Sequence, residues 1–108
     1  MKAWAAALAG DLETWPQVSS RPLFGLTACY RREMIFAVLP KTRGMESPNS
    51  LAFKLPSTTP RLLARIRKDS RIGSTQLQKA RWFTFELSCD ADLHDALEWL
   101  GRAYQAAG

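Results

Sequence analysis

Three consecutive segments with strand-like composition occupy the middle of the chain, and they constrain the fold more than any other feature. The first runs from Phe24 to Tyr30, where alternate residues are apolar, and the others are Met34–Leu39 and Ser50–Leu55. Because the polar link Arg31–Glu33 is too short for a crossover, the first two segments are predicted to form an antiparallel hairpin. The sequence therefore predicts a meander of three strands.

Three helices are predicted around this meander. Apolar residues recur at helical spacing over residues 3–14, and Pro16 ends that pattern. Hydroxyl side chains before Pro60 are a start signal for a second helix that extends to about Lys68. Asp90 is placed to cap a third helix. The apolar seam of this last helix is predicted to consist of Leu93, Leu97, Leu100 and Tyr104.

A fourth strand is expected before the last helix, because Phe83, Phe85 and Leu87 alternate with more polar neighbours. Residues 71–79 hold a glycine and small polar side chains, which favours a loop. The predicted order is α-β-β-β-α-β-α. This order indicates an α+β fold, with a mainly antiparallel sheet of about four to five strands and helices packed on one face. A chain of 108 residues is expected to form one domain, 1–108.

The composition narrows the classes of protein that need to be considered. A hydrophobic fraction of 46% with 23% charged residues is typical of a globular chain. No apolar run approaches the roughly 20 residues of a membrane span, so no membrane partner is predicted. The short, Ala-rich N-terminus indicates a first helix rather than a signal peptide, and we expect a cytoplasmic protein. Cys29 and Cys89 are too few and too far apart to predict a zinc site or a disulfide framework.

Residues that could support catalysis are scarce. The single histidine, His94, lies between Asp90 and Asp95, and a surface role fits that setting better than general-base chemistry. The chain has no Gly-rich phosphate loop, no nucleophile-elbow motif and no pair of histidines at metal-ligand spacing. We therefore predict no catalytic residue, no metal site and no cofactor.

Basic residues concentrate in the second half of the chain. Residues 61–81 carry seven basic side chains and one acidic one, whereas residues 90–108 carry four acidic side chains and one basic one. Such an uneven charge attracts anionic partners or the acidic face of another copy of the chain. The candidate anion or nucleic-acid contacts are Arg61, Arg65, Lys68 and Arg71, of which the first three form a stripe on the second helix. The alternative is a solvated helix face without a ligand.

The other candidate site is the long loop between the second and third predicted strands, over about residues 40–50, which we call the 40s loop. It contains two prolines, a glycine and alternating charges, and long loops in small domains often have a function. Arg43 offers an anion donor and Glu46 an acceptor or base, while Asn49 and Ser50 can orient a ligand by hydrogen bonding. The alternative is a solvated connection in which Arg43 and Glu46 pair with each other.

Several short motifs resemble one known family. They begin with Arg21-Pro22-Leu23-Phe24-Gly25 and continue with Phe36-Ala37, Phe53-Lys54, the Trp82–Leu87 strand and the helix that ends in Ala103-Tyr104. Over about residues 17–104 the chain resembles the TfoX N-terminal and YjbR-like (MmcQ-like) small domains. This resemblance implies a small α+β domain, similar in part to DNA-binding folds, in a family whose founding member regulates competence. The loop Pro40–Asn49 is longer than in that pattern, and we expect no counterpart of the competence regulator's helical second domain in these 108 residues.

Three hypotheses about function follow. The first is a non-catalytic binding or regulatory module that uses the basic helix or the 40s loop to engage an anionic ligand, a nucleic acid or a protein. The second is a small enzyme or small-molecule-binding protein with a pocket bordered by the 40–50 loop, with Arg43 and Glu46 at its edge. The third is an interaction or dimerisation protein. The sequence leaves open whether the chain is a monomer or a homodimer.

Overall fold

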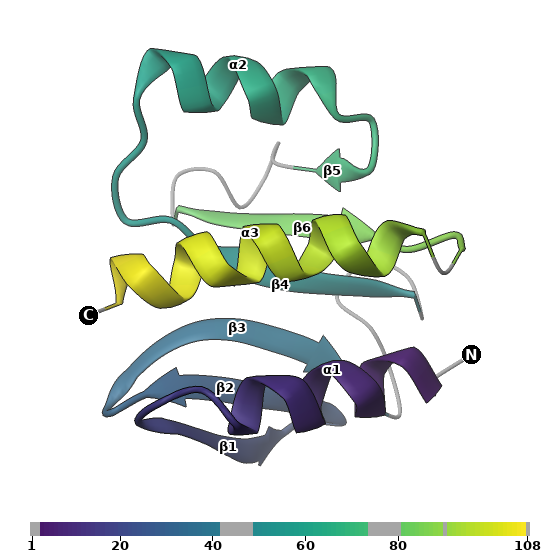
Figure 1. The fold of residues 1–108 in the computed structure, drawn as a ribbon, viewed down its shortest axis with the longest axis vertical. Coiled ribbons are helices and arrows are strands. Elements are labelled where there is room, and N and C mark those ends of the chain that lie inside the picture. The colour runs from purple at the N-terminus through teal and green to yellow at the C-terminus, as the bar shows by residue number, and fades with distance from the viewer. Residues whose placement is uncertain (1–2, 42–48, 74–80, 90, 108) are drawn as a thin grey trace.

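The computed structural model describes residues 3–41, 49–73, 81–89 and 91–107, which form one sheet and three helices (Figure 1). The helices are α1 (Ala3–Glu13), α2 (Pro60–Lys68) and α3 (Asp92–Ala106). The strands are β1 (Val18–Leu23), β2 (Leu26–Arg31), β3 (Met34–Pro40), β4 (Ser50–Lys54), β5 (Ile72–Gly73) and β6 (Trp82–Glu86).

The strands form a six-stranded sheet in the order β1-β2-β3-β4-β6-β5, and every neighbouring pair is antiparallel. The α+β class with an antiparallel sheet is therefore confirmed. The sheet has six strands rather than four to five, and the element order is α-β-β-β-β-α-β-β-α. The two additional strands, β1 and β5, are both edge strands.

The strand β1 was missed because it lacks the alternation that marks a half-buried strand. It reads Val-Ser-Ser-Arg-Pro-Leu, and only its α1-facing side approaches the core. At an edge, Pro22 is tolerated because its missing N–H removes no bond that the fold requires. Consequently Phe24 was wrongly predicted to begin a strand, since it lies in the turn between β1 and β2. The strand β5 has only two residues, too few to give a pattern.

A β-bulge shapes the pairing of β2 with β3. Cys29 pairs with Ala37 and Tyr30 pairs with Ile35, so Phe36 is the additional residue. An extra residue shifts the alternation of side chains, and both Phe36 and Ala37 belong to the main core as a result. The bulge thus places an additional large ring under α3.

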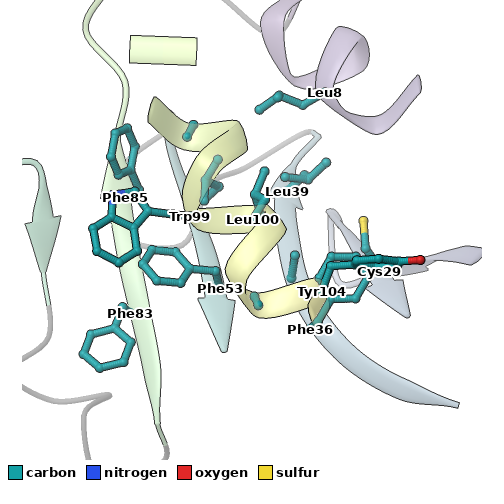
Figure 2. Close-up of a cluster of buried hydrophobic side chains, with 14 of the residues drawn as sticks. Leu8, Cys29, Phe36, Leu39, Phe53, Phe83, Phe85, Trp99, Leu100 and Tyr104 are labelled. Atoms are coloured by element: carbon teal, nitrogen blue, oxygen red, sulfur yellow. The ribbon is translucent and has the colours of Figure 1, made fainter. Parts of the chain in front are cut away.

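The main core lies between the sheet and the helices α1 and α3, which cover the same face (Figure 1). Phe53 of β4 is fully buried, with its ring stacked at 5.7 Å from that of Phe83 and at 5.6 Å from that of Trp99 (Figure 2). Leu8 and Leu12 join this core from α1. A smaller cluster of Leu26, Val38 and Ala52 lies on the opposite face of the sheet.

The buried face of α3 differs from the predicted seam. Leu100 and Tyr104 are buried as expected, but Leu93 and Leu97 only pack at the margin of the core. The face toward the sheet consists of Ala96, Trp99, Leu100, Ala103 and Tyr104. Small alanine side chains allow the helix to approach the sheet closely, which a count of leucines does not reveal. The N-cap of α3 is Ala91, which makes no side-chain cap bond, and Asp90 lies outside the described residues.

Replacement of Phe53 by Ala should destabilise the fold by about 3–5 kcal/mol, because it removes a buried ring and leaves a cavity between Phe83 and Trp99. Urea unfolding followed by circular dichroism measures this loss. The matched control is Met34→Ala, which truncates a half-exposed side chain and should change the stability by about 0.5 kcal/mol or less. Equal effects of both substitutions would contradict this description of the core.

Candidate functional site

The helix α2 begins and packs as the sequence predicts. The Thr59 hydroxyl accepts a hydrogen bond from the Leu62 amide at 3.1 Å, and Pro60 occupies the first turn. Ile66 is buried, and Leu62 and Leu63 pack against the main core. These three apolar side chains fix which face of α2 points outward.

The outward side of α2 carries four cations and no acid: Arg61, Arg65, Arg67 and Lys68 are all exposed. Among the described residues, Arg61, Arg67 and Lys68 form no ion pair. Arg65 instead bonds to Glu98 of α3 at 2.8 Å, with both side chains about half-exposed. An exposed pair of this kind is weak, so Arg65 is only partly neutralised.

An open groove of about 460 Å³ runs between the end of α2 and the first half of α3. Its floor is Trp99, whose ring lies below the guanidinium groups of Arg65, at 5.4 Å, and Arg102, at 5.6 Å. The charged side chains in its wall are three cations and three carboxylates: Arg65, Lys68, Arg71, Asp69, Asp95 and Glu98. The predicted basic surface therefore faces acidic partners on α3 along this groove.

Arg71 is the centre of this charge compensation. Its guanidinium donates to both carboxylate oxygens of Asp69 at 2.8 Å, to Asp92 at 2.7 Å and to Asp95 at 3.0 Å. Asp92 in turn accepts hydrogen bonds from the backbone amides of Ser88 and Cys89. The cluster thus joins the segment after α2, the start of α3 and the link that follows β6.

The charges in this cluster stabilise one another. Hydrogen bonds from Arg71 lower the pKa of Asp69, and the backbone amide of Ser88 followed by Arg71 lowers the pKa of Asp92. The carboxylates raise the pKa of Arg71, chiefly through the hydrogen bonds with Asp69. The Arg71 guanidinium already donates hydrogen bonds to three carboxylates. We therefore assign Arg71 a structural role rather than a primary role in ligand binding.

The acidic partners of Arg71 were not identified from the sequence. Asp92 and Asp95 are three residues apart, which places them on one side of α3, and this spacing was the available signal. The ion pairs could not be predicted from local spacing, because Asp92 and Asp95 are more than twenty residues from Arg71 along the chain.

The candidate residues of the 40s loop are only partly described. Arg43 and Glu46 lie outside the described residues. Asn49 is half-buried and its carbonyl accepts from the Leu87 amide at 3.0 Å, while Ser50 is buried and pairs with Glu86 in the sheet. Both residues therefore belong to the start of β4 and its contacts with β6.

The remaining chemically reactive side chains do not gather into a site. His94 is exposed on α3, and Cys89 is exposed whereas Cys29 is buried. Within the described ranges, no group of His, Cys, Asp and Glu side chains is arranged to hold a metal ion. Of the described helices, none is both long and apolar enough to cross a membrane.

No protein-family model matches the chain, and comparisons with curated proteins and with solved structures find no match either. The arguments about function consequently rest on the residues and their geometry.

Replacement of Arg71 by Met should destabilise the protein at pH 7 by about 3 kcal/mol, because three carboxylates lose their shared partner. The folded-state pKa values of Asp69 and Asp92 lie below the ordinary value of 3.8, so the cluster stabilises the fold above that pH. Its contribution is lost as the pH falls through the lowered pKa values. The difference in unfolding free energy between wild type and variant, measured by urea unfolding, should therefore shrink as the pH is lowered below the ordinary aspartate value of 3.8.

Arg71→Lys is the control for this experiment. Lysine keeps the charge but lacks the planar fork that bonds several carboxylates at once, so its stability should lie between the other two. A stability advantage of the wild type over Arg71→Met that does not diminish as the carboxylates become protonated in acid would contradict the ionic role of the cluster.

The two thiols should differ sharply in reactivity. Burial, with a smaller effect of Glu13, raises the pKa of Cys29 to about 12, and the thiolate is the reactive form. In the native protein a disulfide reagent such as Ellman's reagent should modify Cys89 alone, and Cys29 should react only after unfolding in guanidinium. Rapid native reaction in a Cys89→Ser variant would contradict the buried position of Cys29.

Proposed function

We propose that the chain is a non-catalytic binding module that engages a nucleic acid through the outward face of α2. The observation that carries this proposal is the composition of that face: four exposed cations, no acid, and three of the cations without an ion-pair partner in the described part of the chain. A face with these properties is available to the phosphates of a polyanion.

The positions of the cations on the helix suit a linear polyanion. Arg61 and Lys68 are seven residues apart, which puts them on one line along α2 with a separation of about 10 Å. Arg65 and Arg67 flank this line on either side. Each phosphate that such a cation neutralises releases condensed counterions, and this release favours binding without reading the base sequence.

The role of Arg71 changes from the one that the sequence indicated. Its position beside Asp69, Asp92 and Asp95 makes it a support for the groove below α2 rather than a primary contact. The proposed contacts are therefore Arg61, Arg67 and Lys68, with Arg65 contributing when Glu98 releases it. Arg43 and Glu46 have no part in this proposal.

Membership of the TfoX N-terminal and YjbR-like family is part of the same proposal. It is supported by the motifs that begin with Arg21-Pro22-Leu23-Phe24-Gly25 and by an α+β architecture with an antiparallel sheet. A regulatory module of the cytoplasm would meet nucleic acids there, which agrees with the basic face of α2.

Fluorescence anisotropy with a labelled DNA duplex tests the proposal. With about three phosphate contacts, a plot of log K against log salt concentration should have a slope near −2.7. The double variant Arg61→Gln with Lys68→Gln should bind more weakly at low salt and lose about two units of slope.

The control is a double variant that removes the same charge elsewhere, Arg32→Gln with Lys54→Gln. It should keep most of the affinity and the slope, because neither residue lies on α2. Equal losses in both double variants would show that net charge alone drives association. Failure of the wild type to bind at low salt would refute the function.

A further inference from the structure

The turn between β1 and β2 presents a large aromatic ring to solvent. Phe24 is 84% exposed, and its backbone has φ 47°, followed by Gly25 with φ 80°. Two-residue turns with positive φ at both central positions favour Asn-Gly, because a bulky residue is strained in that conformation. Phe24 is thus in a strained backbone conformation and exposes an apolar ring to water, and no contact with the described part of the chain explains its presence.

The surroundings of Phe24 are cationic. Lys41 is exposed beside the turn, since it follows Pro40, the residue that pairs with Leu26. Arg21 is also exposed, and its guanidinium lies over the Tyr30 ring at 5.3 Å, on the side away from the turn. Residues 18–26 and 40–41 contain no acid, and the Glu13 carboxylate accepts a hydrogen bond from the Ser20 hydroxyl at 3.1 Å further along β1. Pro22 is exposed and Leu23 half-buried, so the strained ring continues a short apolar tip with cations beside it. This combination complements a partner that is anionic at its surface and apolar below it.

The shape of the tip discriminates between partners with this chemistry. A ring that is 84% exposed projects from the protein and does not lie in a groove. Nucleic-acid strands are usually held along grooves, and peptides are usually held in pockets or along sheet edges. A lipid bilayer requires no groove on the protein, because its fluid interface closes around a projecting side chain.

We propose that the Phe24 tip is an anchor for the surface of an anionic lipid bilayer. The ring enters the boundary between headgroups and acyl chains, Lys41 contacts lipid phosphates, and Arg21 adds positive charge close to the anionic surface. The sequence predicted no membrane partner because no segment is long enough to span a bilayer, but an interfacial anchor needs no such segment. The tip belongs to the edge of the sheet opposite α2, so this site is separate from the proposed nucleic-acid face (Figure 1).

The expected affinity is modest. One inserted ring raises the affinity by about tenfold or more, and each cation near an anionic surface raises it by about fivefold. The anchor is thus weaker than or comparable to a single myristoyl chain, about 10⁴ M⁻¹, and it makes association reversible.

Co-sedimentation of the full chain with lipid vesicles tests the anchor. Vesicles of phosphatidylcholine are compared with vesicles that contain about one-third phosphatidylglycerol, at lipid concentrations up to the millimolar range. We expect binding to the anionic vesicles, and a reduction by about tenfold in Phe24→Asn. The same variant should have a higher melting temperature, since Asn is preferred in this turn. A gain in stability together with a loss of binding separates an anchor from a structural residue.

Two further variants complete the test. Phe24→Trp should keep vesicle binding, and Arg21→Gln with Lys41→Gln should abolish the preference for anionic lipid. The matched control is Met34→Asn, which removes an exposed apolar side chain at the start of β3, at the end of the β2–β3 pair away from Phe24, and should leave binding unchanged.

Four results would overturn the proposal. The first is a wild type that does not bind anionic vesicles, and the second is a Phe24→Asn variant that binds them as well as the wild type does. The third is a Met34→Asn variant that loses as much vesicle binding as Phe24→Asn, and the fourth is a Phe24→Asn variant with a lowered melting temperature. If Phe24→Asn weakens duplex DNA binding and leaves vesicle binding intact, the occupant of the tip is a nucleic acid and the lipid anchor is wrong. The salt slope of the α2 variants is measured separately, so either proposal can fail without the other.

Discussion

The ion cluster around Arg71 determines how the second half of the chain is assembled. Three carboxylates from two separate segments share one guanidinium, and the amides of Ser88 and Cys89 hold one of those carboxylates in place. Without this cluster, like charges on Asp92 and Asp95 would meet at the first turn of α3. With it, α2 and α3 lie beside one groove, and the outward face of α2 keeps its unpaired cations.

The main elements of the fold could be predicted from local patterns. Thr59-Pro60 defined the start of α2, and the alternation of Phe83 and Phe85 defined β6. The edge strands β1 and β5 could not be predicted in this way, because one is polar and interrupted by proline and the other has two residues. The buried side of α3 was partly misassigned because Ala96 and Ala103 face the sheet, where close packing requires small side chains.

The candidate site, like the fold, could be predicted from local sequence patterns only in part. The basic face of α2 follows from helical spacing alone, whereas the neutralisation of Arg71 depends on contacts across more than twenty residues. Phe24 illustrates a different limit. The alternating pattern predicted that Phe24 lies in a strand with its side chain half-buried. Gly25 after it was the signal of a turn, and in that turn the Phe24 side chain is exposed.

The edge strand β1 has a consequence for behaviour in concentrated solution. An open strand edge invites another chain to add to the sheet, which is the usual route to aggregation. Here one edge carries Pro22, which lacks an N–H, beside the charged side chain of Arg21, and the other edge is only two residues long. Both edges of the described sheet therefore oppose its growth into larger assemblies.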